Sequence, residues 1–141
     1  MVITAAEVSD GDTSNDSTLS LTFTSNEATT NFAEGDITVS GGSLSSFAAT
    51  SSTVYTATFT PSIDEGATTI DVGAGTFTDA SGNNNTAATQ FNWTYDGTGP
   101  TMAITAAEVS DGDTSNDSTL SLTFTSSEAC LLYTSPSPRD S

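Results

Sequence analysis

Residues 18–24 have the sequence TLSLTFT, and this stretch decides the fold class. Its apolar side chains alternate with hydroxyl side chains, so that in an extended chain Leu19, Leu21 and Phe23 share one face. Strict alternation over this length is typical of a strand with one buried face, and the pattern predicts an all-β protein. The same alternation recurs in 36–40 (Ile37, Val39), 53–60 (Tyr55, Ala57, Phe59), 68–72 (Ile70, Val72) and 90–95 (Phe91, Trp93, Tyr95).

Two further strands are expected, an irregular one over 2–8 and a short one over 44–47 with Leu44 and Phe47 facing inward. The segments between strands are rich in Asp, Asn, Gly, Ser and Pro, the residues that favour turns. About seven short strands joined by polar turns predict a two-sheet β-sandwich of Greek-key type, without helices. The turn segments are SDGDTSND, NEATTNFAEG, GGS, PSIDEG and DASGNNN.

The chain contains an internal repeat, because residues 3–25 and 104–126 are identical in sequence. The match continues at Glu27 and Glu128, and beyond residue 129 the two copies diverge. A complete domain is therefore expected over 1–98. Residues 99–129 are expected to form a linker and the first two strands of a truncated second repeat.

The last twelve residues, 130–141, differ in composition from the rest. They contain the only cysteine, Cys130, and the only basic residue, Arg139. The sequence CLLYTSPSPRD resembles one reading frame of a transposase-type sequencing adapter, so a disordered artefact tail is expected here. The alternative is a proline-rich linker. No signal peptide or membrane-spanning apolar run is visible in the sequence. Met1 aligns with Met102, so an internal methionine is expected at the start.

The formal net charge is −17, from 18 acidic residues and one basic residue. Such a surface repels nucleic acid and anionic membranes, so neither is an expected partner. One cysteine excludes an internal disulfide framework. Because histidine and lysine are absent, the usual general bases and activated nucleophiles are missing, and no enzyme activity is expected. Paired carboxylates can hydrolyse glycosides, but here the acids fall in predicted turns.

Four short motifs stand out along the chain: Glu27 after the second strand, Gly35-Asp36 before the third, FTP at 59–61, and DASGN at 79–83. Together they resemble the bacterial Ig-like domains that are repeated in tandem in large surface and secreted proteins. Family members commonly have D-A-A-G-N at the last position, so Ser81 departs mildly from the pattern. The resemblance implies an extracellular or cell-surface location, neighbouring repeats as partners, and a spacer or adhesive role.

The acidic loops predict a calcium site, because calcium binds oxygens of carboxylates, amides and carbonyls. Alternating strand directions place the loops 9–17, 41–43 and 61–67 at the end where the chain leaves the domain. The loops 26–35 and 74–86 then lie at the opposite end. A junction site is expected from Asp64, Glu65, Asp96 and Glu128, and further candidates are Asp10, Asp12, Asp16, Glu27, Asp79 and Asn83. The alternative is that Asp, Asn and Gly here only form turns.

Two functions remain open on the sequence. The first is a non-catalytic spacer that projects another part of an adhesin-like surface protein, stiffened by calcium between repeats. The second is a carbohydrate- or ligand-binding adhesion module, and a surface glycan or protein could also be bound through other parts of the parent protein. Trp93 could offer a sugar-stacking surface, but its alternation with Phe91 and Tyr95 favours a buried position.

Overall fold

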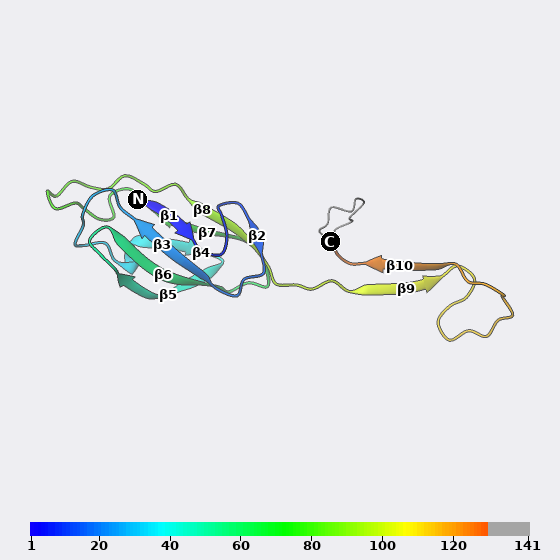
Figure 1. The fold of residues 1–141 in the computed structure, drawn as a ribbon. Helices are drawn as coiled ribbons and strands as arrows, with labels where there is room; N and C mark the ends of the chain where they lie inside the picture. The colour runs from blue at the N-terminus through cyan, green and yellow to red at the C-terminus, as the bar shows by residue number, and fades with distance from the viewer. Residues whose placement is uncertain (130–141) are drawn as a thin grey trace, which may run out of the picture. The chain divides into compact units, whose positions relative to one another are not determined.

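The computed structural model describes residues 1–129 (Figure 1). The backbone divides between Thr98 and Gly99 into two units. The first unit, Met1–Thr98, is a complete two-sheet sandwich. The second unit begins at Gly99, and its described part is one antiparallel strand pair. The disordered artefact tail predicted for 130–141 lies outside the described residues.

The first sheet of the first unit has four antiparallel strands in the order β1-β3-β6-β5. Its central strand β3 contains the alternating stretch quoted above, and it pairs with β6 so that Leu21 lies opposite Ala57. In β5 a bulge between Ser45 and Ala48 shifts the register, and Ser46 there has a positive φ of 55°. The strands are β1 (Val2–Ala5), β3 (Leu19–Thr24), β5 (Gly42–Ala49) and β6 (Val54–Pro61).

The second sheet also has four strands, in the order β2-β8-β7-β4. Strands β4, β7 and β8 pair antiparallel, whereas the two-residue strand β2 runs parallel to β8. A single turn of 3₁₀-helix, Glu34–Asp36, precedes β4. The strands are β2 (Thr13–Ser14), β4 (Ile37–Ser40), β7 (Glu65–Val72) and β8 (Phe91–Asp96).

Three strand predictions were incomplete. The first strand ends at Ala5 rather than at residue 8, because the chain then crosses to the other sheet and forms β2 inside a predicted turn. The strand expected over 44–47 extends over Gly42–Ala49, because β6 supplies a partner along its length. Strand β7 starts at Glu65, inside the predicted PSIDEG turn, because its first residues pair with the end of β8.

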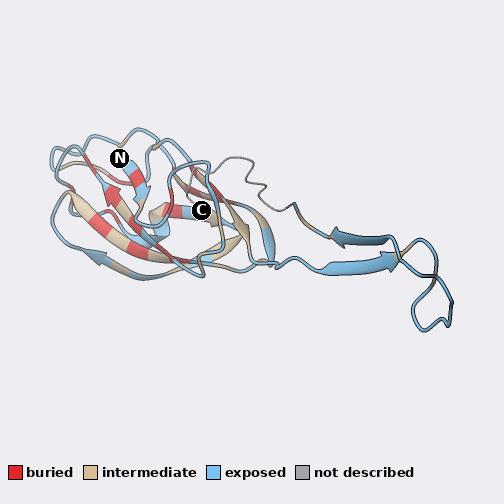
Figure 2. Ribbon diagram, turned by 45° about the vertical axis from the view of Figure 1, so that its right-hand side comes forward, coloured by how far each residue is buried: buried red, intermediate tan, exposed pale blue. Residues whose placement is uncertain are grey.

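The core lies between the two sheets, and the alternation predicts most of it correctly. Leu19, Phe23, Phe59 and Ile70 are completely buried, and Trp93 is 1 % exposed. Figure 2 shows the buried residues recurring along the strands of the first unit. Val39, Leu44, Phe47 and Tyr95, also predicted to face inward, are partly buried and pack against this core.

Two core residues come from segments that were predicted only as loops. Phe32 lies in the loop after β3 and Phe77 in the loop after β7, and both are buried. The rings of Phe32 and Phe77 meet edge to face with centroids 5.0 Å apart, and Phe32 is equally close to Tyr55. The Tyr55 hydroxyl donates to the carbonyl of Thr29 at 2.9 Å. These contacts hold both loops against the core.

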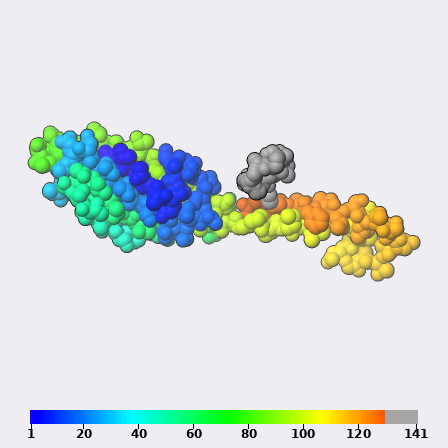
Figure 3. All heavy atoms as spheres, viewed as in Figure 1, coloured from blue at the N-terminus to red at the C-terminus, as the bar shows by residue number. Residues whose placement is uncertain are grey.

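The loops of the first unit gather at two ends. At the trailing end, where the chain leaves, the end of β8 lies opposite the start of β7, and Ser62 donates to the Gly41 carbonyl. At the leading end, where the chain enters the first unit, Asn31 and Thr78 join the loops after β3 and β7 by two hydrogen bonds. Figure 3 shows these two loops at one end of the first unit and residues around 10–18 at the other. This is the arrangement that counting strand directions predicts.

The second unit contains β9 (Met102–Ala106) and β10 (Leu122–Ser126), paired antiparallel. They repeat the β1–β3 pair of the first unit, since Ile104 lies opposite Phe124 as Ile3 lies opposite Phe23. Residues 114–115, the equivalents of β2, form no strand, because the described second unit has no equivalent of β8. Strand β3 begins at Leu19, whereas β10 begins only at Leu122. The counterpart of Leu19, Leu120, lies outside the strand because the same neighbours are absent.

Candidate functional site

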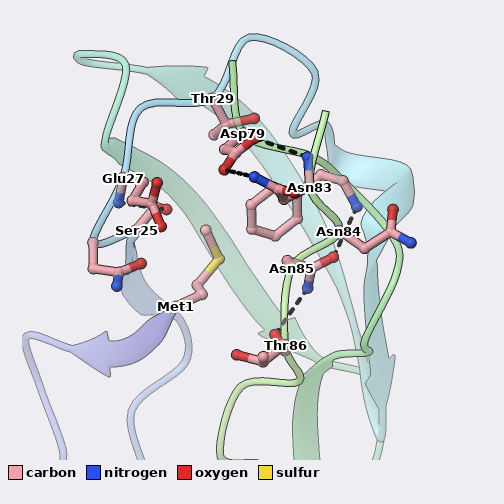
Figure 4. A pocket seen from close by; sticks show the side chains of 11 residues that line it. Met1, Ser25, Glu27, Thr29, Asp79, Asn83, Asn84, Asn85 and Thr86 are labelled. Carbon is pink, nitrogen blue, oxygen red and sulfur yellow. Dashed lines mark hydrogen bonds between the residues drawn. The ribbon is translucent and has the colours of Figure 1, made fainter. Parts of the chain in front are cut away.

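A polar pocket of about 270 Å³ opens at the leading end of the first unit (Figure 4). Glu27 comes from the loop after β3, Asp79 and Asn83 come from the loop after β7, and all three line the pocket. The structure thus brings together three of the predicted loop candidates. The side chain of Met1 also lines it.

Hydrogen bonds within its own loop hold the carboxylate of Asp79. Its Oδ1 accepts from the backbone N–H groups of Ser81 at 2.8 Å and of Asn83 at 2.9 Å. Its Oδ2 accepts from the Asn83 side-chain amide at 3.0 Å. These bonds, the one from the Asn83 side chain foremost, lower the pKa of Asp79 below its ordinary value of 3.8. Asp79 and Asn83 therefore bind each other and close a turn.

Asn85 organises the same pocket and was not singled out in the sequence. Its Oδ1 accepts from the backbone N–H groups of Thr76 at 2.8 Å and Phe77 at 3.0 Å, and its Nδ2 donates to the carbonyls of Gly73 and Thr86. All four side-chain bonds go to backbone within one loop, so the role is structural. The only sequence signal was the run of three asparagines at 83–85, which has no distinguishing spacing.

A general acid in a glycosidase needs a raised pKa, whereas hydrogen bonding lowers the pKa of Asp79. No histidine or lysine occurs in the chain. The pocket is lined by two carboxylates, Glu27 and Asp79, and by several amide side chains, and the side chains of Asp79 and Asn83 already bond each other.

The acids of the first loop at the trailing end mostly bond to nearby backbone. Asp10 accepts from the N–H of Asn92 on β8 at 2.6 Å, and Asp12 accepts from the N–H of Ser9 at 2.8 Å. Asp16 accepts a hydrogen bond from the hydroxyl of Ser14. These bonds tie the loop to β8 and fix its turns, and calcium binding by the three acids stays a prediction.

The four residues predicted to form the junction site are divided between the two units. In the first unit Asp64 precedes Glu65, which pairs with Asp96 across β7 and β8. The backbone carbonyl of Asp64 also accepts from Gly97 at 3.1 Å, and Asp96 accepts from Thr98 at 3.3 Å. Glu128 lies in the second unit, just beyond β10. Within residues 1–129, no group of three or more acidic, histidine or cysteine side chains is placed to hold a metal ion.

The order β1-β3-β6-β5 on one sheet and β2-β8-β7-β4 on the other defines an immunoglobulin-like sandwich, the constant-type arrangement with one added short strand. The model of the family described as bacterial Ig-like domain matches residues 3–95. The chain therefore belongs to the bacterial Ig-like domain family. No curated protein and no solved structure gave a match.

Membership of this family points to a structural repeat of surface proteins, and such modules are generally non-catalytic. Over the residues that the structure describes, no helix is long and apolar enough to cross a membrane.

Proposed function

We propose that the chain is part of a spacer, a non-catalytic array of Ig-like modules that projects another part of an extracellular, adhesin-like surface protein. One observation carries the proposal: the chain enters the first unit at one end of the sandwich and leaves at the other. Val2 lies opposite Thr24 at the leading end, and Asp96 lies opposite Glu65 at the trailing end. Modules joined in this way add their lengths to one another.

The link between modules is short. Strand β8 ends at Asp96, and in the second unit Thr101 already exchanges hydrogen bonds with Ser127, just ahead of β9. Only residues 97–100 lie between these paired positions, and Pro100 restricts its own φ. A link of four residues leaves little unpaired chain between consecutive modules, which suits a spacer.

The spacer proposal is tested by the length of arrays. Proteins with one, two and four complete copies of residues 1–101 should show a maximum dimension in X-ray scattering that grows by an equal step for each copy. Arrays whose dimension grows much less with each copy would contradict the proposal. The same proteins should bind nothing reproducibly on a glycan array, whereas reproducible binding would favour the carbohydrate-binding alternative.

We further propose that calcium stiffens the junctions between repeats. What supports it is charge: Asp64, Glu65 and Asp96 lie at the trailing end, and no basic residue occurs in residues 1–129 to balance them. Since these three acids alone form no metal-binding group, the ligands have to be completed by the following repeat, where Glu128 is the candidate. A divalent cation there would offset the repulsion between the carboxylates.

This proposal is tested by melting a protein with two complete repeats in millimolar calcium and in chelator. Calcium should raise the Tm of the two-repeat protein more than that of one repeat, because ligand binding stabilises by RT ln(1 + [L]/Kd). Asp96→Asn should reduce the difference. Asp71→Asn is the matched control, since Asp71 lies within β7 and its carboxylate bonds Gln90. Equal melting with calcium and chelator would rule out the junction site.

A further inference from the structure

The second unit exposes an apolar sheet face. Ile104, Leu122 and Phe124 lie on one side of the β9–β10 pair and are 65 %, 53 % and 59 % exposed. Their counterparts in the first unit, Ile3, Leu21 and Phe23, are 7 % exposed or less. Identical residues in the same strand register are therefore covered in one unit and uncovered in the other. In Figure 2 both strands of the second unit are drawn mainly in the exposed colour.

The first unit shows what covers this face. Strand β3 pairs with β6 along six residues, from Leu19 opposite Phe59 to Thr24 opposite Val54. Its apolar side faces the core that β7 and β8 complete, and the ring of Phe23 lies 5.9 Å from that of Phe32. Every one of these partners belongs to residues 26–98. Because residues 104–126 repeat 3–25 letter for letter, they match the same surface.

We propose that residues 102–126 are a donor hairpin that docks on residues 26–98 of a second copy of this chain, in the place of that copy's own residues 3–25. Strand β10 then pairs with the partner's β6 in the register of β3, and Phe124 enters the space of Phe23. The occupant of the exposed face is thus the open sandwich of another module.

The free energy of docking depends on the state of the acceptor's own first hairpin. In two intact chains the exchange exposes one hairpin for each that it buries, so it gives no net gain in buried apolar surface. It becomes favourable when the acceptor's own first hairpin is open or defective, because docking then buries an apolar face on both sides. The shared negative charge opposes association, and salt at roughly 0.5 M screens it.

The test uses two versions of the full chain. The acceptor has both of its hairpins disabled by Leu21→Asp, Phe23→Asp, Leu122→Asp and Phe124→Asp, and it is labelled with ¹⁵N. The donor is the unlabelled chain without substitutions. We expect the acceptor alone to give the narrow amide spectrum of an unfolded chain, and to gain a dispersed spectrum and a one-to-one complex mass when the donor is added.

Two donors with the same charge change provide the controls. Phe124→Asp places the charge on the apolar face and should abolish the rescue. Thr125→Asp places it on the opposite face, where the equivalent Thr24 is exposed in the first unit, and should retain the rescue. The proposal is overturned if the unsubstituted donor leaves the acceptor unfolded, if the Phe124→Asp donor rescues equally well, or if the acceptor folds alone.

Discussion

The same phenylalanine occupies two environments in this chain. Phe23 is completely buried, whereas Phe124, in an identical local sequence, is 59 % exposed. Phe23→Ala should reduce the free energy of unfolding of the first unit by about 3–5 kcal/mol, because it leaves a cavity in a packed core. Phe124→Ala should change it by less than about 0.5 kcal/mol. Urea unfolding followed by the fluorescence of Trp93, the only tryptophan, measures both. Equal effects of the two substitutions would contradict the burial difference.

A second prediction at this scale concerns Asp79 and pH. Its pKa in the folded chain lies below the ordinary value of 3.8, chiefly through the Asn83 side chain. A lowered pKa stabilises the fold above the pKa of the unfolded chain, and that stability is lost as the pH falls through the lower, folded-state value. Asn83→Ala should therefore raise the pKa of Asp79 towards 3.8, as followed by an NMR titration of its carboxyl carbon. A titration unchanged by the substitution would show that the side-chain bond is unimportant.

At the scale of elements, alternation in the sequence was enough to locate β3, β6 and β8, because each buries one face and exposes the other. It could not locate β2, whose two residues form a strand only because β8 lies beside them. Phe32 and Phe77 were missed for a related reason: loop residues enter a core through tertiary contacts and leave no periodic signal. For the candidate site, the sequence predicted only separate acidic residues. The hydrogen bonds that bind Asp79 to its own loop depend on a turn conformation, which the spacing of residues in the sequence does not reveal.

The start of β5 allows a test of how closely two strands pack. A Cβ added to Gly42 would lie 2.4 Å from Cζ of Phe59 and 2.5 Å from the Thr60 carbonyl oxygen. Gly42→Ala should therefore destabilise the first unit by about 1–3 kcal/mol, as overpacking does. Gly35→Ala is the control, because a Cβ there meets nothing within 4 Å and φ is not positive. That change should be neutral or stabilising by up to about 1 kcal/mol. Chemical denaturation of both variants measures the difference, and equal losses would contradict the close approach at Gly42.

At the scale of the whole molecule, the two units differ in what their strands can bury. The first unit closes a core between two four-stranded sheets. The described part of the second has one strand pair, and a single two-stranded hairpin is marginally stable in water. It nevertheless keeps a local contact of the module, because Glu108 accepts from the N–H and the hydroxyl of Ser121 as Glu7 does from Ser20. Such exposed bonds close the loop between the two strands, but they bury no apolar face.

We therefore expect limited proteolysis to cut the chain near residues 98–100 and to leave residues 1–98 as a resistant fragment. Cleavage requires local opening, which costs little where few apolar contacts hold the backbone. Amide hydrogen exchange gives the same comparison residue by residue, and the identical sequences remove any difference in intrinsic exchange rate. Amides of 19–24 should be protected far more strongly than those of 120–125, at concentrations low enough to keep the chain monomeric. Equal protection of the two segments would mean that the second hairpin is already covered in solution, and the resistant fragment would then extend beyond residue 98.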